Sequence, residues 1–355
     1  MCDGYATGNR FRVASVSPVM ATPEATARFD GSAYRSFETD EGDLRISSVG
    51  IGTYLGDADD ATDAAYVDAL TTAFGIGCNV VDTAINYRNQ RSERAVGEAL
   101  RETDADRDEV FVSTKGGYIP FDGDAPENPS AYIRDEYVET GLVPPEETVQ
   151  ANCLAPRFLR SQVERSLENI GVEKLDLYYV HNPETHLREA SHEELEDRLR
   201  RAFEALEDEV EAGRIGAYGV ATWNGFRVPS ARNDHLSMER VVEAARDAGG
   251  DENALAAVQM PFNAKMTSAA TVETQEVGGE KMSALQAAKK LGLYVFTSAS
   301  LMQGTLAKEH VGEKGGGTPA QDALRYASMT KGVGTALVGS SSAAHVEENL
   351  SFLRE

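Results

Sequence analysis

Short apolar runs alternate along this chain with longer segments in which apolar positions recur at helical spacing. Uninterrupted apolar runs are typical of parallel strands, because helices cover such strands on both faces. Eight strands are predicted, at residues 49–54, 79–83, 110–115, 175–181, 215–222, 256–263, 294–300 and 335–339. Helices are predicted between and after them, at residues 60–76, 91–103, 156–171, 191–213, 237–249, 279–292, 318–331 and 343–353.

This order of elements predicts one α/β domain over residues 34–355, a (β/α)8 TIM barrel. A barrel of this kind closes with eight strand–helix units, and eight such units alternate regularly along this chain. A doubly wound sheet is the alternative architecture. However, Gly50-Ile-Gly52 in the first strand does not continue into the G-x-G-x-x-G pattern that opens a helix in dinucleotide-binding folds.

The segments outside the repeat also carry predictions. Two short runs, residues 34–37 and 44–46, flank an acidic turn and predict a β-hairpin that closes the bottom of the barrel. Insertions at residues 117–153 and 264–278 follow strands 3 and 6, so both are expected on the carboxyl-terminal rim, where barrel enzymes keep their active sites. Residues 1–33 are expected to form a poorly ordered leader, because their short apolar stretch does not resemble a secretory signal.

Charge is the most unusual bulk property of the chain. There are 58 acidic against 34 basic residues, a net charge of −24, and only nine lysines. Such a surface repels nucleic acids and anionic membranes, so neither is an expected partner. Its self-repulsion is screened in molar salt, which predicts a protein from a high-salt environment. No run approaches the roughly 18 apolar residues of a membrane helix, and a cytoplasmic location is expected.

Metal chemistry is not expected. The three cysteines and six histidines show none of the spacings typical of metal ligands, and three cysteines do not form a disulfide framework.

Polar residues stand at the ends of three consecutive predicted strands. Asp82 ends the second, Lys115 the third and His181 the fourth, and Tyr87 follows Asp82 by five residues. Lys115 is also the only lysine in the first 173 residues. Taken singly, these residues fit a structural ion pair, a packing aromatic and a satisfied strand-end histidine. A buried Asp82 also needs a cationic partner, which Lys115 on the adjacent strand can supply. Because four such groups on three consecutive strand ends are unlikely to meet by chance, together they predict a catalytic site.

These residues stand in segments that resemble the successive signatures of the aldo/keto reductase family. The resemblance runs from about residue 34 to the C-terminus. The segments are Asp82-Thr-Ala-x-x-Tyr87, Ser92-Glu93 with Gly97, Val-Phe-Val-Ser-Thr-Lys115, Leu-Asp-Leu-Tyr-Tyr-Val-His181, residues 213–220, Val258-Gln259 and residues 339–349. The resemblance implies an NAD(P)H-dependent oxidoreductase that interconverts a small-molecule aldehyde or ketone and its alcohol.

The family's catalytic tetrad would be Asp82, Tyr87, Lys115 and His181. Tyr87 would donate a proton to the carbonyl oxygen while the cofactor supplies hydride. A free phenol has a pKa near 10, so the ammonium of Lys115 is expected to lower it. Asp82 would hold Lys115, and His181 would orient the substrate oxygen or share the proton.

The resemblance also implies NADPH as cofactor, with NADH as the alternative. The expected cofactor-binding residues are Gly52, Thr53, Tyr54, Asp82, Thr222, Gln259, Ser298, Leu301, Gln303, Gly339, Ser340, Ser341, His345, Glu348 and Asn349. The family's usual basic residues near the adenosine phosphate are replaced by Gly339 and His345. Its Ser-Asn after strand 5 reads Ala221-Thr222, and Ser298 replaces the aromatic that stacks on the nicotinamide. Weak discrimination between the two cofactors follows.

The insertions on the rim, rather than the motifs, are expected to determine the substrate. Six residues suggest partly aromatic walls, with loop packing as the alternative: Tyr118, Phe121, Tyr132, Tyr137, Cys153 and Trp223. Two other functions remain open. One is a nicotinamide-binding regulatory subunit that senses redox state without turnover. The other is a barrel lyase or isomerase that uses Lys115 as a Schiff-base amine.

Overall fold

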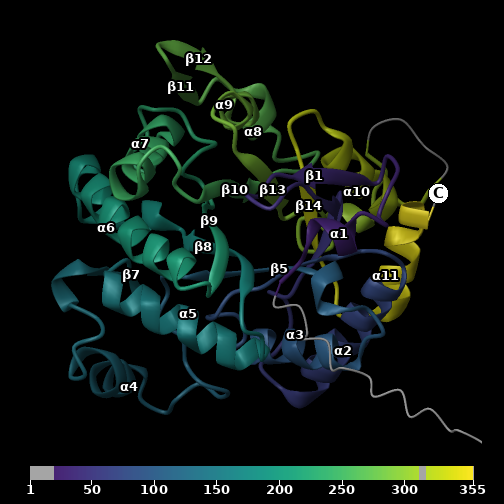
Figure 1. Cartoon of the computed structure of the whole chain (residues 1–355), viewed down its shortest axis with the longest axis horizontal. Helices are drawn as coiled ribbons and strands as arrows, with labels where there is room; N and C mark the ends of the chain where they lie inside the picture. The colour runs from purple at the N-terminus through teal and green to yellow at the C-terminus, as the bar shows by residue number, and fades with distance from the viewer. Residues whose placement is uncertain (1–19, 312–316, 355) are drawn as a thin grey trace, which may run out of the picture.

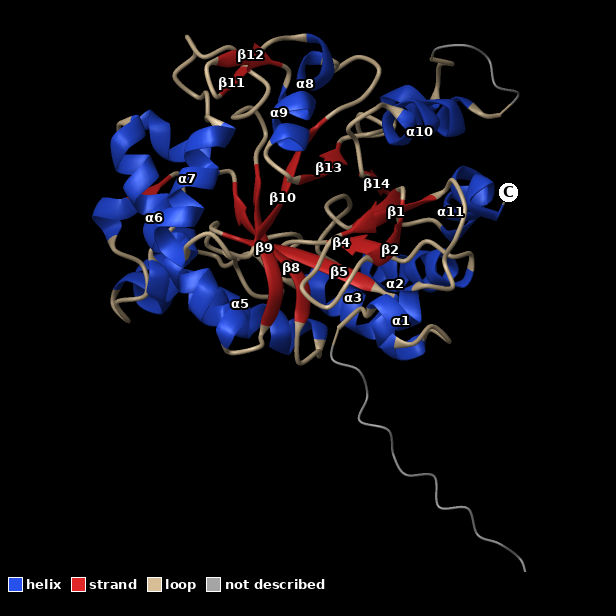
Figure 2. Cartoon of the chain, turned by 45° about the horizontal axis from the view of Figure 1, so that its top comes forward, coloured by secondary structure: helices blue, strands red, loops and turns tan. Residues whose placement is uncertain are grey.

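The computed structural model of the chain describes residues 20–311 and 317–354. Its centre is a closed barrel of eight parallel strands, in which each strand pairs with the next in chain order and the last with the first. The strands are β3 (Val49–Gly52), β4 (Val80–Asp82), β5 (Phe111–Gly116), β8 (Leu175–His181), β9 (Ile215–Ala221), β10 (Leu255–Pro261), β13 (Tyr294–Ser298) and β14 (Thr335–Gly339). The predicted TIM barrel is confirmed, and Figure 2 shows its strands in red inside a ring of blue helices.

The helices around the barrel also follow the predicted pattern. They are α2 (Asp60–Gly75), α3 (Arg91–Glu102), α5 (Pro156–Ile170), α6 (His192–Glu211), α7 (Met238–Gly249), α9 (Ala284–Lys290), α10 (Pro319–Met329) and α11 (Ala343–Leu350). Side-chain caps define several starts. For example, Ser191 accepts a hydrogen bond from the Glu194 amide while the Glu194 side chain accepts one from the Ser191 amide.

The helix predicted at residues 279–292 is wrong at its start. Residues 275–282 instead form an antiparallel hairpin of β11 (Gln275–Val277) and β12 (Glu280–Met282). Gly278 and Gly279 at its tip have φ of 62° and 78°, the left-handed conformation of a tight hairpin turn. Figure 1 shows this hairpin at the periphery, beyond α9.

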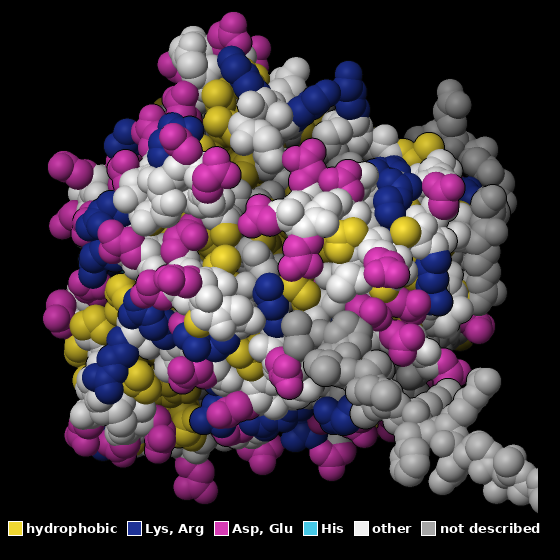
Figure 3. Space-filling model, in the orientation of Figure 1, with side chains coloured by type: hydrophobic (Ala, Val, Ile, Leu, Met, Phe, Trp, Pro, Cys, Tyr) yellow, Lys and Arg dark blue, Asp and Glu magenta, His cyan; other side chains and the backbone are white. Residues whose placement is uncertain are grey.

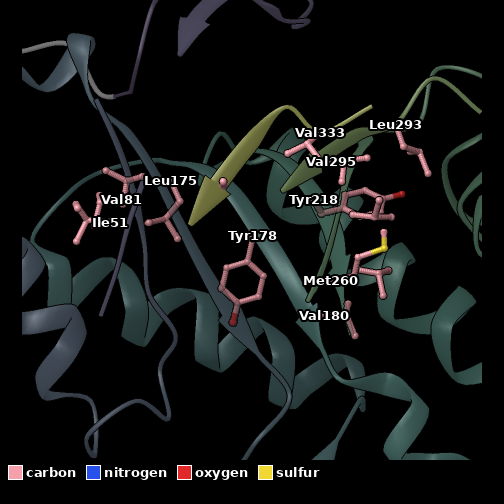
Figure 4. Packing of buried hydrophobic residues seen from close by; sticks show 14 of the residues in the cluster. Ile51, Val81, Leu175, Tyr178, Val180, Tyr218, Met260, Leu293, Val295 and Val333 are labelled. Carbon is pink, nitrogen blue, oxygen red and sulfur yellow. The ribbon is translucent and has the colours of Figure 1, made fainter. Parts of the chain in front are cut away.

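Two hydrophobic clusters separate the inside of the barrel from its outside. Since side chains alternate along a strand, Val80, Phe111 and Leu177 point into the barrel and form one cluster. Val81, Val180 and Met260 belong to the larger cluster between strands and helices, part of which Figure 4 shows. The inner cluster fills the interior of the lower barrel and separates its two ends.

The bottom of the barrel is closed by the predicted hairpin, β1 (Tyr34–Phe37) paired with β2 (Leu44–Ser47). Phe37 packs edge-on against Phe111 of the inner cluster, with ring centroids 5.0 Å apart. The hairpin prediction is confirmed.

The expected leader divides into two parts. Residues 1–19 lie outside the described residues. For residues 20–33 the prediction of poor order is wrong, because they pack on the barrel and include the short helix α1 (Pro23–Thr26). Ala21 is buried and its amide donates to Asp176 Oδ1 at 2.7 Å, while the Thr22 amide donates to the Asp108 carbonyl at 2.9 Å.

Both predicted insertions follow the carboxyl ends of their strands. Residues 117–153 contain α4 (Pro129–Ile133), a π-helical turn (Arg134–Val138), β6 (Thr148–Val149) and β7 (Asn152–Cys153) around a small core of their own. Residues 264–278 contain α8 (Ser268–Thr271) and β11. Short 3-10 turns lie at Arg107–Glu109, Pro145–Glu147, Pro183–Arg188, Thr305–Ala307 and Ser351–Arg354. Among the described residues, no helix is long and apolar enough to cross a membrane.

Candidate active site

A cleft of ≈ 520 Å³ opens at the carboxyl-terminal end of the barrel. It is lined by twelve of the residues predicted for catalysis or cofactor binding: Gly52, Thr53, Tyr54, Asp82, Tyr87, His181, Thr222, Gln259, Ser298, Leu301, Gln303 and Gly339. Strand alternation explains why several meet there. Asp82, His181 and Gln259 have the same parity as the inward-facing Val80, Leu177 and Ala257 of their strands.

Lys115 and Asp82 form a buried ion pair at the floor of this cleft. Lys115 has no exposed surface, and its Nζ lies 2.5 Å from Asp82 Oδ2 and 2.7 Å from the Thr83 carbonyl oxygen. Burial lowers the pKa of Lys115, and the adjacent Asp82 charge opposes that shift. The ammonium is therefore already engaged by two oxygens of the chain.

Two further residues hold Asp82, and sequence reasoning did not assign them this role. Ser113 Oγ donates to Asp82 Oδ1 at 2.8 Å, and Gln259 Nε2 donates to the same oxygen at 3.0 Å. Strand parity places Ser113 on the same inward face as Lys115, so that signal was present in the sequence. The contact of Gln259, 177 positions away, becomes visible only when the barrel closes.

Tyr87 lies above the ion pair. The Lys115 Nζ is 5.0 Å from the centre of the Tyr87 ring, and the rings of Tyr54 and His181 lie 5.0 and 5.9 Å from it. Burial raises the pKa of Tyr87 well above 10, and the Asp82 charge adds to the shift. The prediction that this pKa is lowered is wrong, because burial of the phenol, with a smaller contribution from the Asp82 charge, raises it. Tyr87 is thus a protonated phenol and can donate at neutral pH.

The turn after Tyr87 is strained and firmly anchored. Arg88, Asn89 and Gln90 have φ of 49°, 57° and 70°, a left-handed conformation that non-glycine residues rarely adopt. The Arg88 guanidinium donates to the Asp57 carbonyl at 2.8 Å and lies 2.5 Å from Asp63 Oδ1. This anchor joins Tyr87 to the loop that follows Tyr54, and no motif indicated it.

His181 closes the other side of the cleft. Burial, with a smaller effect of the Lys115 charge, lowers the pKa of His181 well below 6.5, so the imidazole is neutral. Its backbone carbonyl accepts a hydrogen bond from Asn152 Nδ2 at 2.8 Å, and Asn152 Oδ1 is 3.0 Å from His186 Nε2. A neutral imidazole has one N–H, which can donate to a substrate carbonyl oxygen, and one nitrogen that accepts.

Some predicted site residues do not join this cleft. Ser340, Ser341, His345, Glu348 and Asn349 lie on the turn after β14 and on α11, away from the cleft lining. Only Gly339 connects that turn to the cleft.

The predicted aromatic walls are also divided. Tyr118 and Trp223 line the cleft. Phe121, Tyr132 and Tyr137 instead pack together within the insertion, with ring centroids 5.6 and 6.0 Å apart along that series, and Cys153 is buried there. For these four residues the loop-packing alternative is the correct one.

Four buried polar atoms around the cleft have no hydrogen-bond partner in the described chain: Asn86 Oδ1, His181 Nδ1, Thr222 Oγ1 and Ser300 Oγ. Each unpaired buried polar group costs on the order of 1–3 kcal/mol, so the cleft is suited to a ligand that offers both donors and acceptors. A carbonyl substrate beside a nicotinamide carboxamide has this chemistry. No group of three or more His, Cys, Asp or Glu side chains suited to a metal ion occurs within residues 20–311 and 317–354.

Comparison with known proteins finds the same family that the sequence motifs resemble. The aldo/keto reductase family profile matches residues 48–355. The chain is 21% identical over 324 residues (86% of this chain, 84% of the relative) to a "Putative voltage-gated potassium channel subunit beta" of Schizosaccharomyces pombe. It is 29% identical to a D-threo-aldose 1-dehydrogenase of a Pseudomonas species over 43% of this chain, and 28% identical to an NADH-specific methylglyoxal reductase of Escherichia coli over 39%. These two alignments span only 42% and 39% of the relatives themselves.

Solved structures match across nearly the whole chain. An aldo-keto reductase from Klebsiella pneumoniae in complex with NADPH has a TM-score of 0.60 at 20% identity, covering 91% of this chain and 90% of that one. A glycerol dehydrogenase from Gluconobacter oxydans has a TM-score of 0.62 at 18% identity, covering 90% of each chain. At these identities the matches establish the fold.

Proposed function

The chain belongs to the aldo/keto reductase family of NAD(P)-dependent oxidoreductases, and we propose that its cleft reduces an aldehyde or ketone to an alcohol, or catalyses the reverse oxidation. One observation carries the proposal. The rings of Tyr87 and His181 lie edge to face, 5.9 Å apart, in a cleft whose floor is the buried Asp82–Lys115 pair. These groups supply an acid, an orienting donor and a fixed local charge.

The proposed reaction uses each of these groups once. A reduced nicotinamide bound in the cleft supplies the hydride that forms the new C–H bond. Tyr87 donates its phenolic proton to the carbonyl oxygen, so the C=O π bond is replaced by one C–H and one O–H bond. His181 holds that oxygen in line with the phenol. The buried Asp82–Lys115 pair would form a fixed floor beneath Tyr87, with the Lys115 ammonium 5.0 Å from the centre of the Tyr87 ring.

NADPH is the proposed cofactor, with NADH as the alternative. Thr222, Gln259 and Ser298 would surround the nicotinamide, because they line the cleft at the ends of β9, β10 and β13. Gly339, Ser340, Ser341 and His345 would face the adenosine end. The relatives include both an NADPH complex and an NADH-specific enzyme, so family membership leaves the preference open.

The test is a turnover assay. The purified full chain would be mixed with NADPH or NADH and a panel of aldehydes, ketones and sugars, and cofactor oxidation would be followed by absorbance. We expect turnover of at least one carbonyl compound. Cofactor binding without turnover of any member would overturn the proposal.

That opposite outcome would favour a redox-sensing regulatory subunit. The single observation in its favour is the likeness to the channel-subunit relative of Schizosaccharomyces pombe. The Schiff-base alternative is opposed by the burial of Lys115, whose amine has no exposed surface and two oxygen partners.

We also propose that the protein works in concentrated salt. Its support is the net charge of −24, and Figure 3 shows acidic side chains spread over the visible face with basic ones between them. Since the Debye length falls to about 3 Å at 1 M, molar KCl screens the repulsion between these carboxylates. The melting temperature should rise steeply from low to molar KCl. A melting temperature that stays flat would contradict this proposal.

A further inference from the structure

Glu184 is a buried carboxylate beside the cleft that the proposed reaction does not use. It lies on the 3-10 turn Pro183–Arg188, directly after β8, and only 6% of its surface is exposed. Its Oε1 accepts hydrogen bonds from three consecutive amides of the loop after β9. The distances are 2.7 Å to Trp223, 3.0 Å to Asn224 and 3.4 Å to Gly225. Its Oε2 is buried without a partner.

This arrangement fixes one short piece of backbone very firmly. Burial raises the pKa of Glu184, and the three backbone hydrogen bonds oppose the shift. The carbonyl of Trp223 is also held, by a 2.7 Å hydrogen bond from Arg227 Nε. Because a buried carboxylate costs several kcal/mol unless it is well paired, Glu184 at this position is expected to serve the loop it binds.

The loop brings Trp223 to the mouth of the cleft. Trp223 lines the cleft yet is 49% exposed, which is unusual for so large an apolar side chain. Tyr54, 58% exposed, and Tyr118 line the same cleft. Aromatic faces of this kind bind apolar and aromatic groups, and 49% of the Trp223 surface is open to solvent.

The charge of the cleft lining limits which substrates it can bind. Over the described part of the chain its lining contains no lysine or arginine. Its carboxylate, Asp82, is paired with Lys115. A carboxylate or phosphate on the substrate would therefore lose hydration without gaining a cationic partner.

We propose that Glu184 is a positioning residue that holds Trp223 as the wall against which the aromatic or apolar group of an uncharged carbonyl substrate packs. This proposal rests on the proposed function. The specificity would come from indole contact, and Glu184 would act on it only through the backbone of residues 223–225.

Trp223 is the single tryptophan of the chain, so its fluorescence reports this wall directly. Glu184→Ala removes the acceptor of all three amides, whereas Glu184→Gln retains a side-chain oxygen at that place. Glu209→Gln is the matched control. Glu209 is equally buried, but its carboxylate pairs with Arg214 at the opposite end of β9.

In Glu184→Ala we expect stronger acrylamide quenching and lower fluorescence anisotropy of Trp223, because its indole moves more freely. The ratio of kcat/KM for benzaldehyde over propanal should fall by about tenfold, mainly through KM, because ground-state packing is lost. Glu184→Gln should stay within about threefold of the parent in that ratio, because the oxygen acceptor is retained. Glu209→Gln should change stability while leaving both readouts unchanged.

Further variants and measurements keep the proposal testable if Glu184→Ala does not fold or if the chain does not turn over a carbonyl compound. Trp223→Ala should lose the benzaldehyde preference, and Trp223→Phe should keep most of it. The parent should prefer benzaldehyde over 4-carboxybenzaldehyde by at least about tenfold in kcat/KM, the cost of an uncompensated charge. If no carbonyl compound is turned over, a change in Trp223 fluorescence on adding benzyl alcohol still tests whether an aromatic group packs against the indole. The proposal is overturned if Glu184→Ala behaves like Glu209→Gln, or if the charged aldehyde reacts equally well.

Discussion

The floor of the cleft and the turn after β14 are built in opposite ways. Asp82, Lys115 and His181 project inward from strand ends and are buried, and short hydrogen bonds fix the Asp82 and Lys115 side chains and the His181 backbone. Ser341 and His345 are exposed on a loop and a helix start, where the Ser342 cap of α11 is a 3.4 Å hydrogen bond. Strand geometry therefore fixes the proposed catalytic residues, whereas the proposed adenosine-end residues lie on an exposed turn.

The difference also shows in charge. At the floor, every charge has a partner at 2.5–3.0 Å. At the turn, the residues expected at the adenosine end of the cofactor are two serines, a glycine and one histidine. Substitutions at the floor should therefore be costly, and substitutions in the turn should have small effects.

The largest expected effect is that of Lys115→Met. Removing the ammonium leaves Asp82 buried without its cation, so the free energy of unfolding should fall by about 3–5 kcal/mol. Asp82→Asn combined with Lys115→Met should recover part of this loss. Denaturant unfolding at matched salt measures both, with Ser341→Ala as the control within about 0.5 kcal/mol of the parent. A Lys115→Met protein as stable as the parent would show that the floor is not energetically distinct from the turn.

The next effect concerns the proton. Tyr87→Phe should reduce carbonyl turnover by at least about 10²-fold, the typical contribution of a general acid, while cofactor binding persists. Steady-state kinetics and a fluorescence titration of the cofactor measure the two quantities separately. Near-parental turnover in Tyr87→Phe would assign the proton to another group.

A smaller effect is expected at the turn. Discrimination of NADPH from NADH needs cationic forks around the 2′-phosphate, and hydroxyls add no charge. The preference for NADPH should therefore stay below about tenfold, or roughly 1.4 kcal/mol, in titrations of both reduced cofactors at matched molar salt. A hundredfold preference would mean that the phosphate is bound by residues outside this turn.

The smallest effect concerns pH. Because the pKa of His181 is lowered below 6.5 and that of Tyr87 is raised above 10, neither group changes protonation between these limits. The kcat for carbonyl reduction at saturating cofactor should vary by less than about threefold from pH 7 to 9. An alkaline decline with a midpoint near 8 would show that Tyr87 titrates much lower than its burial implies.

The amino-acid sequence by itself determined the eight strands, the hairpin beneath the barrel and the strand ends that carry Asp82, Lys115 and His181. These follow from local periodicity, since a strand that alternates inward and outward fixes which side chains can meet at the rim. The same strand parity also predicts that Ser113 faces inward, although no motif indicated its role.

Only the tertiary structure decided the electrostatics and the supports of the site. The direction of the Tyr87 pKa shift depends on burial and on the nearby Asp82 charge. Gln259 reaches Asp82 across 177 positions, and Glu184 reaches Trp223 across 39. Sequence periodicity describes neighbours along the chain, whereas desolvation and hydrogen bonding depend on which distant segments the closed barrel brings together.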